Sequence, residues 1–66
     1  MKSLKDIGST LKTLRGNQSP GEAAFTLGIS KSALFMYERG ERMPRDEVKE
    51  RIASHYGSTV QHIFFD

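Results

Sequence analysis

The stretch SPGEAAFTLGISKSALFMYE, residues 19–38, contains two helix starts with a sharp break between them. Its first four residues form a capping box, with Ser19 before the helix, proline in the first helical position and glutamate in the third. Gly28 suits a left-handed helix end, and Ser30 can cap the helix that follows. These signals predict two short helices joined by a turn of about three residues, over 20–27 and 31–39.

Apolar spacing and caps outside this stretch predict three more short helices. Ser3 can cap a helix over 4–15, Pro44 opens a fourth helix, and Thr59 caps a final turn or two. No segment shows sustained strand alternation, so we expect an all-α fold of five helices in a single domain over 1–66. The residues expected to face inward are Leu4, Ile7, Leu11, Leu14, Val48, Ile52, Ala53, Tyr56, Val60, Ile63 and Phe64.

Length and composition exclude several classes of protein. A chain of 66 residues makes one small domain, and without cysteine it has neither disulfides nor a thiolate metal site. The absence of cysteine fits a reducing cytoplasm. The first ten residues alternate charged with single apolar residues, which is typical of neither a signal peptide nor a membrane span. We therefore expect a cytoplasmic protein with no membrane association.

Positive charge follows the second of the two central helices. The net charge of +2 is too small to indicate nucleic acid by itself, but Arg39, Arg42 and Arg45 recur at every third residue. Two short helices joined by a three-residue turn, with Ala24 where they pack closest, have the layout of a helix-turn-helix. A solvated basic loop is the ordinary role of such a charge run. Phosphate binding is the role that this layout favours.

The chain resembles the lambda-repressor-like helix-turn-helix domains of the Cro and xenobiotic-response-element type. The matching stretches are IGSTLKTLR at 7–15, SPGEAAFTLGIS at 19–30, YERGERMP at 37–44 and IASHYGSTVQHIF at 52–64. The resemblance implies a compact bundle of five helices that binds operator DNA, usually as a homodimer. It implies a transcription regulator, with repression at a palindromic operator as the expected mode. We expect no cofactor, metal ion or small-molecule substrate.

The resemblance also implies a role for each residue around the second central helix, which would enter the major groove. The matching base-reading or groove-facing positions are Lys31, Ser32, Ala33, Phe35 and Met36. The phosphate-binding positions are Ser19, Gly21, Ser30, Arg39, Arg42 and Arg45. Arg15 and Glu38 match an ion pair that holds the reading helix on its scaffold. The dimer contact is expected at Ile63, Phe64 and Phe65.

Several residues allow a second interpretation. Phe35 and Met36 could belong to a protein contact or to the core instead of the groove. Phe64 and Phe65 could close the core instead of forming a dimer interface, which is the favoured role for Phe65. His55 and His62 predict no metal site, because a glycine breaks the helix between them and no further ligand completes the set.

No residues suggest catalysis, so we do not expect an enzyme. The functional alternative to a regulator is a protein-interaction module, such as an antirepressor or antitoxin, that keeps the scaffold without reading DNA. Two features motivate this alternative: the apolar groove-facing side of the second central helix, and Pro20, which stands where similar domains commonly have a phosphate-binding glutamine.

Overall fold

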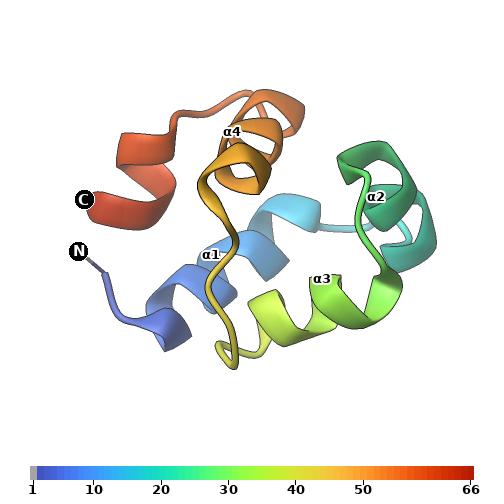
Figure 1. Cartoon of the computed structure of the whole chain (residues 1–66), viewed down its shortest axis with the longest axis horizontal. Coiled ribbons are helices and arrows are strands. Elements are labelled where there is room, and N and C mark those ends of the chain that lie inside the picture. Colours follow the sequence, from blue (N-terminus) through green and yellow to red (C-terminus); the bar gives the residue numbers. More distant parts are fainter. Residues whose placement is uncertain (1) are drawn as a thin grey trace.

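Five short helices pack around one core in the computed structural model, which describes residues 2–66 (Figure 1). They are α1 (Leu4–Arg15), α2 (Pro20–Leu27), α3 (Lys31–Glu38), α4 (Asp46–His55) and the π-helical segment η1 (Gln61–Phe65). No strand occurs within residues 2–66. The prediction of an all-α, five-helix fold is confirmed.

Side-chain caps begin three of these elements, as their sequences predict. The hydroxyls of Ser3, Ser19 and Ser30 accept hydrogen bonds from first-turn backbone N–H groups of α1, α2 and α3. The Thr59 hydroxyl accepts one from the backbone N–H of His62 in η1. The capping box of α2 differs in one detail. The carboxylate of Glu22 accepts from the Ser19 hydroxyl at 3.1 Å, and within the described part of the chain it does not bond to the Ser19 backbone N–H. Gly28 ends α2 in the left-handed conformation, with φ +70°.

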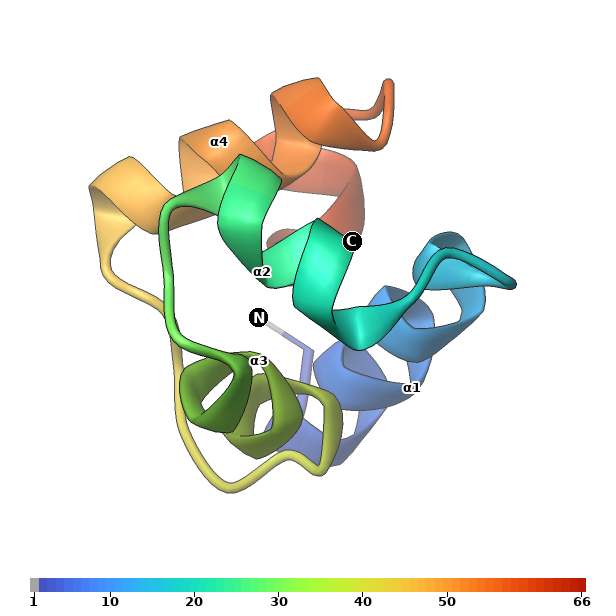
Figure 2. The same cartoon turned by 90° about the vertical axis from the view of Figure 1, so that its right-hand side faces the viewer.

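Each helix buries one face against its neighbours. α1 packs against α3 and η1, and α2 packs against α3 and α4. In Figure 2, which looks along α3, α1 lies on one side of this helix and the chain leading to α4 passes on the other. None of the helices within residues 2–66 is long and apolar enough to cross a membrane. The core residues are Ile7, Leu11, Ala23, Ala24, Leu27, Leu34, Tyr37, Val48, Ile52, Ala53, Ile63 and Phe64.

Three sequence-based expectations about the core and the helix ends were wrong in detail. Leu4 and Leu14 were expected to face inward but are exposed, with 38% and 36% of their surface accessible. Pro44 is buried before α4 and does not open it, since the helix begins at Asp46. Tyr56 lies one residue beyond the end of α4, although its half-buried side chain packs against the core as expected.

Gly8 allows α1 and α3 to approach at backbone distance. A β-carbon on Gly8 would lie 2.5 Å from the carbonyl oxygen of Glu38 and 2.9 Å from the backbone nitrogen of Gly40. Both atoms belong to the backbone, which cannot turn aside as a side chain can. The end of α3 is therefore seated directly on the middle of α1.

Candidate nucleic-acid interface

The outward face of α3 carries the residues predicted to read bases. Leu34 and Tyr37 are the buried residues of α3, so they mark the side of the helix that faces the core. Because successive residues are turned by about 100° around a helix, Ser32 and Met36 lie on the opposite side. Lys31 and Ser32 are exposed near the start of the helix. The remaining three residues, Ala33, Phe35 and Met36, are half-buried. The first turn of α3 thus offers its polar side chains to a ligand, and the later turns offer partly covered apolar ones.

Three of the predicted phosphate-binding residues gather beside this face. Ser30, Arg42 and Arg45 line a hollow of about 250 Å³ between the start of α3 and the segment that leads to α4. We call it the loop-side hollow. Both arginines are exposed, and neither forms an ion pair within residues 2–66. Two unpaired guanidinium groups next to a helix N-terminus attract an anion, because the helix dipole adds positive potential there. The full lining is Ile29, Ser30, Ala33, Tyr37, Arg42, Met43, Arg45, Glu47 and Val48.

The other predicted phosphate site, at the start of α2, has fewer donors available. The Ser19 hydroxyl is engaged twice, since it accepts from the Glu22 N–H and donates to the Glu22 carboxylate. Pro20 has no N–H. The Gly21 N–H has no acceptor within the described chain, so it is the first-turn donor that remains for a phosphate. The Glu22 carboxylate adds negative charge beside it.

An ion pair joins the end of α1 to the end of α3. Arg15 Nε donates to Glu38 Oε2 at 2.7 Å and Arg15 Nη2 donates to Oε1 at 3.1 Å, which is a bidentate arrangement. A third bond runs from Arg15 Nη1 to the backbone oxygen of Gln18, at 2.9 Å. The side chains of Arg15 and Glu38 are 13% and 4% exposed, and the hydrogen bond that Arg15 donates to Glu38 raises the pKa of Arg15. One guanidinium group therefore ties together α1, α3 and the connection between α1 and α2.

Tyr56 gives a prediction about stability near this pair. Its hydroxyl is buried and has no hydrogen-bond partner among residues 2–66. Burial, followed by the charge of Glu38, raises the pKa of Tyr56. Tyr56→Phe removes a buried unpaired donor, so we expect the free energy of unfolding to rise by about 1 kcal/mol. Tyr37→Phe is the matched control, because the Tyr37 hydroxyl is not among the buried unpaired groups. Urea denaturation measures both, and a loss of stability in Tyr56→Phe would contradict the prediction.

Arg39 lies on the opposite flank of α3 from the other two arginines. Together with Lys12, Arg15, Phe35 and Glu38 it lines a second hollow, of about 260 Å³, which we call the α1-side hollow. Arg39 Nε and Nη2 donate to the carboxylate of Glu41 at 2.8 and 3.2 Å, and this hydrogen bonding raises the pKa of Arg39. Lys5 Nζ also donates to the backbone oxygen of Arg39 at 3.0 Å, where α3 ends. The three predicted arginines therefore do not form one cluster.

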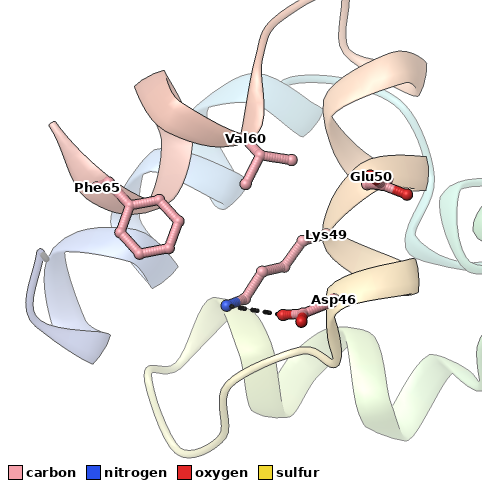
Figure 3. A pocket seen from close by; sticks show the side chains of 5 residues that line it. All are labelled: Asp46, Lys49, Glu50, Val60 and Phe65. Carbon is pink, nitrogen blue, oxygen red and sulfur yellow. Dashed lines mark ion pairs between the residues drawn. The ribbon is translucent and has the colours of Figure 1, made fainter.

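The C-terminal residues divide between the core and the surface. Ile63 and Phe64, which were predicted to form the dimer contact, are 0% exposed inside the protomer, so they cannot contribute surface to a partner. Phe65 is 40% exposed. It lies beside a hollow of about 340 Å³ between η1 and α4, lined by Asp46, Lys49, Glu50, Val60 and Phe65 (Figure 3). Core closure is the role that the structure supports for Ile63 and Phe64.

Lys49 is a buried cation that the apolar pattern of α4 does not reveal. Its ammonium lies 5.5 Å from the centre of the Phe64 ring, 5.4 Å from that of Phe65 and 3.6 Å from Asp46 Oδ1 (Figure 3). Aromatic rings at such distances attract a cation through their negative faces. The sequence signal for this contact was the adjacent pair Phe64 and Phe65, which can offer two aromatic rings to a lysine on a neighbouring helix.

The order of the helices and the short turn before α3 have a counterpart among known families. Residues 6–63 match the family model described as a helix-turn-helix domain. The chain belongs to this helix-turn-helix family. Its matching segment contains all of α2 and α3 and most of α1 and η1. The helix-turn-helix proper consists of α2, the turn at Gly28 and α3.

Two solved structures resemble this helix-turn-helix protein. The restriction-modification controller protein C.AhdI from Aeromonas hydrophila is 25% identical, with a TM-score of 0.82 over 92% of this chain and 96% of that one. The clp gene regulator ClgR from Corynebacterium glutamicum is 21% identical, with a TM-score of 0.80 over 91% of this chain and 66% of that one, and its likeness shows the fold alone. Among curated proteins, no sequence matches the chain.

These similarities support the family resemblance seen in the sequence. The protein has a Cro-like helix-turn-helix fold of the xenobiotic-response-element type, which is a DNA-binding fold of transcription regulators. Neither of the two similar structures is described by a catalytic activity.

Proposed function

We propose that this protein is a cytoplasmic transcription repressor that binds a palindromic operator as a homodimer, with α3 in the major groove. The observation that carries the proposal is the loop-side hollow. Ser30, Arg42 and Arg45 line it together with the carboxylate of Glu47. Ser30 directly precedes the exposed Lys31 and Ser32 of α3 in the chain. A phosphate in this hollow would hold the start of α3 against the edges of the bases.

The residues of this face divide into two roles. Lys31 can donate to guanine O6 or N7 and Ser32 can bond to several bases, while Met36 offers an apolar surface to a thymine methyl group. Arg42 and Arg45 meet the backbone, which is the same for every sequence. Bound at the operator, the protein represses by occluding the DNA from other proteins.

Phe65 supports the homodimer. It is an exposed aromatic side chain at the end of the chain, next to the hollow lined by Val60 and Lys49 (Figure 3). In a two-fold contact each Phe65 can cover the hollow of the other subunit, which buries apolar area on both sides. The protomer extends 27 Å in its longest direction. Two protomers side by side can therefore place their α3 helices about 34 Å apart, which is one turn of DNA.

The division of roles predicts different behaviour for two substitutions. Lys31→Ala should cost about 1 kcal/mol at one base position and little elsewhere, because it removes a base contact. Arg42→Ala should weaken binding to all sequences and reduce the slope of log affinity against log salt by about one unit. Fluorescence polarisation with selected and random duplexes at several salt concentrations measures both effects. Equal losses on both duplexes from both substitutions would refute the assignment.

Selection of bound duplexes from a random pool tests the rest of the proposal. A homodimer on a palindromic operator should enrich inverted half-sites with centres about one helical turn apart. Enrichment of a single half-site would contradict the two-fold arrangement. Placing the enriched sequence within a promoter ahead of a reporter gene should lower expression when the protein is present, and raised expression would contradict repression.

One observation favours the alternative of a protein-interaction module. Phe25 on α2 is 88% exposed, the largest value among the exposed large apolar side chains. Such a side chain commonly contacts another protein. The polarisation titration separates the two functions, because a DNA-binding protein shows at least non-specific, salt-dependent affinity for a random duplex. A complete lack of binding at low salt would favour the interaction module.

A further inference from the structure

We propose that Lys12 on α1 forms a second phosphate-binding site, in the α1-side hollow, which contacts the DNA strand opposite the one held by Arg42 and Arg45. This inference rests on the proposed function, because its ligand is a phosphate of the duplex that α3 enters. It adds to the interface a helix that lies outside the helix-turn-helix itself.

The two hollows lie on opposite flanks of α3. Ala33 and Tyr37 line the loop-side hollow, and Phe35 and Arg39 line the α1-side hollow. At about 100° per residue, these two pairs are turned roughly 160° from each other around the helix. Figure 2 shows the same arrangement, with α1 on one side of α3 and the segment before α4 on the other. A helix in the major groove has one phosphate backbone on each side, so each hollow faces its own strand.

Lys12 carries the unpaired charge of the α1-side hollow. Arg15 is neutralised by Glu38, and all three of its nitrogen atoms are engaged. Two nitrogen atoms of Arg39 donate hydrogen bonds to the carboxylate of Glu41. Lys12 is exposed, and its side chain forms no ion pair or hydrogen bond within residues 2–66. A phosphate entering this hollow therefore meets a free ammonium group and does not have to break an existing ion pair.

The rigid support of Lys12 strengthens the proposal. It lies on α1 one turn before Arg15, whose bidentate bond fixes α1 to α3. The backbone of Lys12 is thus held at a fixed position relative to the reading helix by two packed helices. A side chain that starts from a rigid helix loses less freedom on binding than one that starts from a mobile loop.

The test uses Lys12→Gln, with Lys12→Arg to restore the charge and Lys2→Gln as the control. Lys2 lies beside η1 through a bond from its ammonium to the His62 backbone oxygen, so Lys2→Gln removes the same charge away from α3. Each variant is titrated with a random-sequence duplex at several salt concentrations. Thermal unfolding is measured alongside, because a lysine in the last turn also stabilises a helix through its dipole.

Lys12→Gln should reduce the salt slope by about one unit, so its affinity deficit should shrink about threefold as salt rises from about 50 to about 200 mM. Lys12→Arg should restore the slope, and Lys2→Gln should leave it unchanged. Combined with Arg42→Ala, the losses should add, because the two sites contact different phosphates.

Two results would overturn the proposal while the proposed function stands. One is an unchanged salt slope in Lys12→Gln when Arg42→Ala reduces it. The other is an equal reduction in Lys12→Gln and Lys2→Gln, which would indicate net charge alone. If the unmodified protein binds no duplex at low salt, both the proposed function and the second phosphate site are wrong.

Discussion

Gly8→Ala is expected to lower the free energy of unfolding by about 2–3 kcal/mol, because the added methyl group meets backbone atoms that cannot rotate away. The nearest is the Glu38 carbonyl oxygen, 2.5 Å from the new carbon position. Alanine is more favourable than glycine inside a helix by about 1 kcal/mol. The measured loss of unfolding free energy is therefore the energetic cost of the clash minus that gain. Urea denaturation followed by circular dichroism provides the measurement.

Gly21→Ala is the matched control for this change. Gly21 also lies in a helix, and a β-carbon built there would have no neighbour within 4 Å. We expect the substitution to stabilise the protein by about 0.5 kcal/mol through the lower entropy of the unfolded chain. If Gly8→Ala were as favourable as Gly21→Ala, the direct seating of α3 on α1 would be disproved.

Glu38→Ala is expected to cost about 2–3 kcal/mol of stability, because it leaves the Arg15 guanidinium largely buried with one remaining acceptor. The pair joins α1 to α3, so its loss should also weaken DNA binding by loosening the reading helix. Thermal unfolding and duplex titration of the same variant measure both effects.

Glu41→Ala removes the exposed pair with Arg39 and serves as the control for Glu38→Ala. The side chains of Arg39 and Glu41 are 57% and 51% exposed, so the unfolding midpoint of Glu41→Ala should be essentially that of the unmodified protein. A double change, Arg15→Met with Glu38→Leu, should recover stability relative to Glu38→Ala, because no buried charge is left unpaired. Equal stability of Glu38→Ala and Glu41→Ala would contradict the structural importance of the buried pair.

Most of the secondary structure could be predicted from local sequence signals. Ser19 and Ser30 cap the helices that follow them, and Gly28 occupies the left-handed position between them. These signals are reliable because a cap acts on N–H groups two or three residues away and needs no distant partner. The family resemblance added the fold and the pairing of Arg15 with Glu38, which no local pattern indicates.

Other features depend on how the helices pack. The apolar spacing of α1 predicts that Leu11 and Leu14 both face inward, but of these two only Leu11 is buried. Gly8 within the same helix gave no hint that the carbonyl of Glu38 approaches it. The sequence is compatible with Phe64 either in the core or in a dimer contact, and its complete burial supports the core. Helical periodicity indicates which side of a helix is apolar, but it does not give the length or position of the neighbouring helix that packs against that side.

The sequence by itself determined where α1, α2 and α3 begin and that α2 and α3 form a helix-turn-helix, because capping and turn chemistry act over a few residues. Only the tertiary structure decided how the positive charges are grouped. Arg42 and Arg45 lie on one flank of α3, and Arg39 and Lys12 lie on the other, although three of these four are close in sequence. The physical reason is that the packing of the backbone decides toward which side of α3 each charged side chain faces. The arginines themselves do not decide it, since exposed charged side chains gain little free energy from any one conformation.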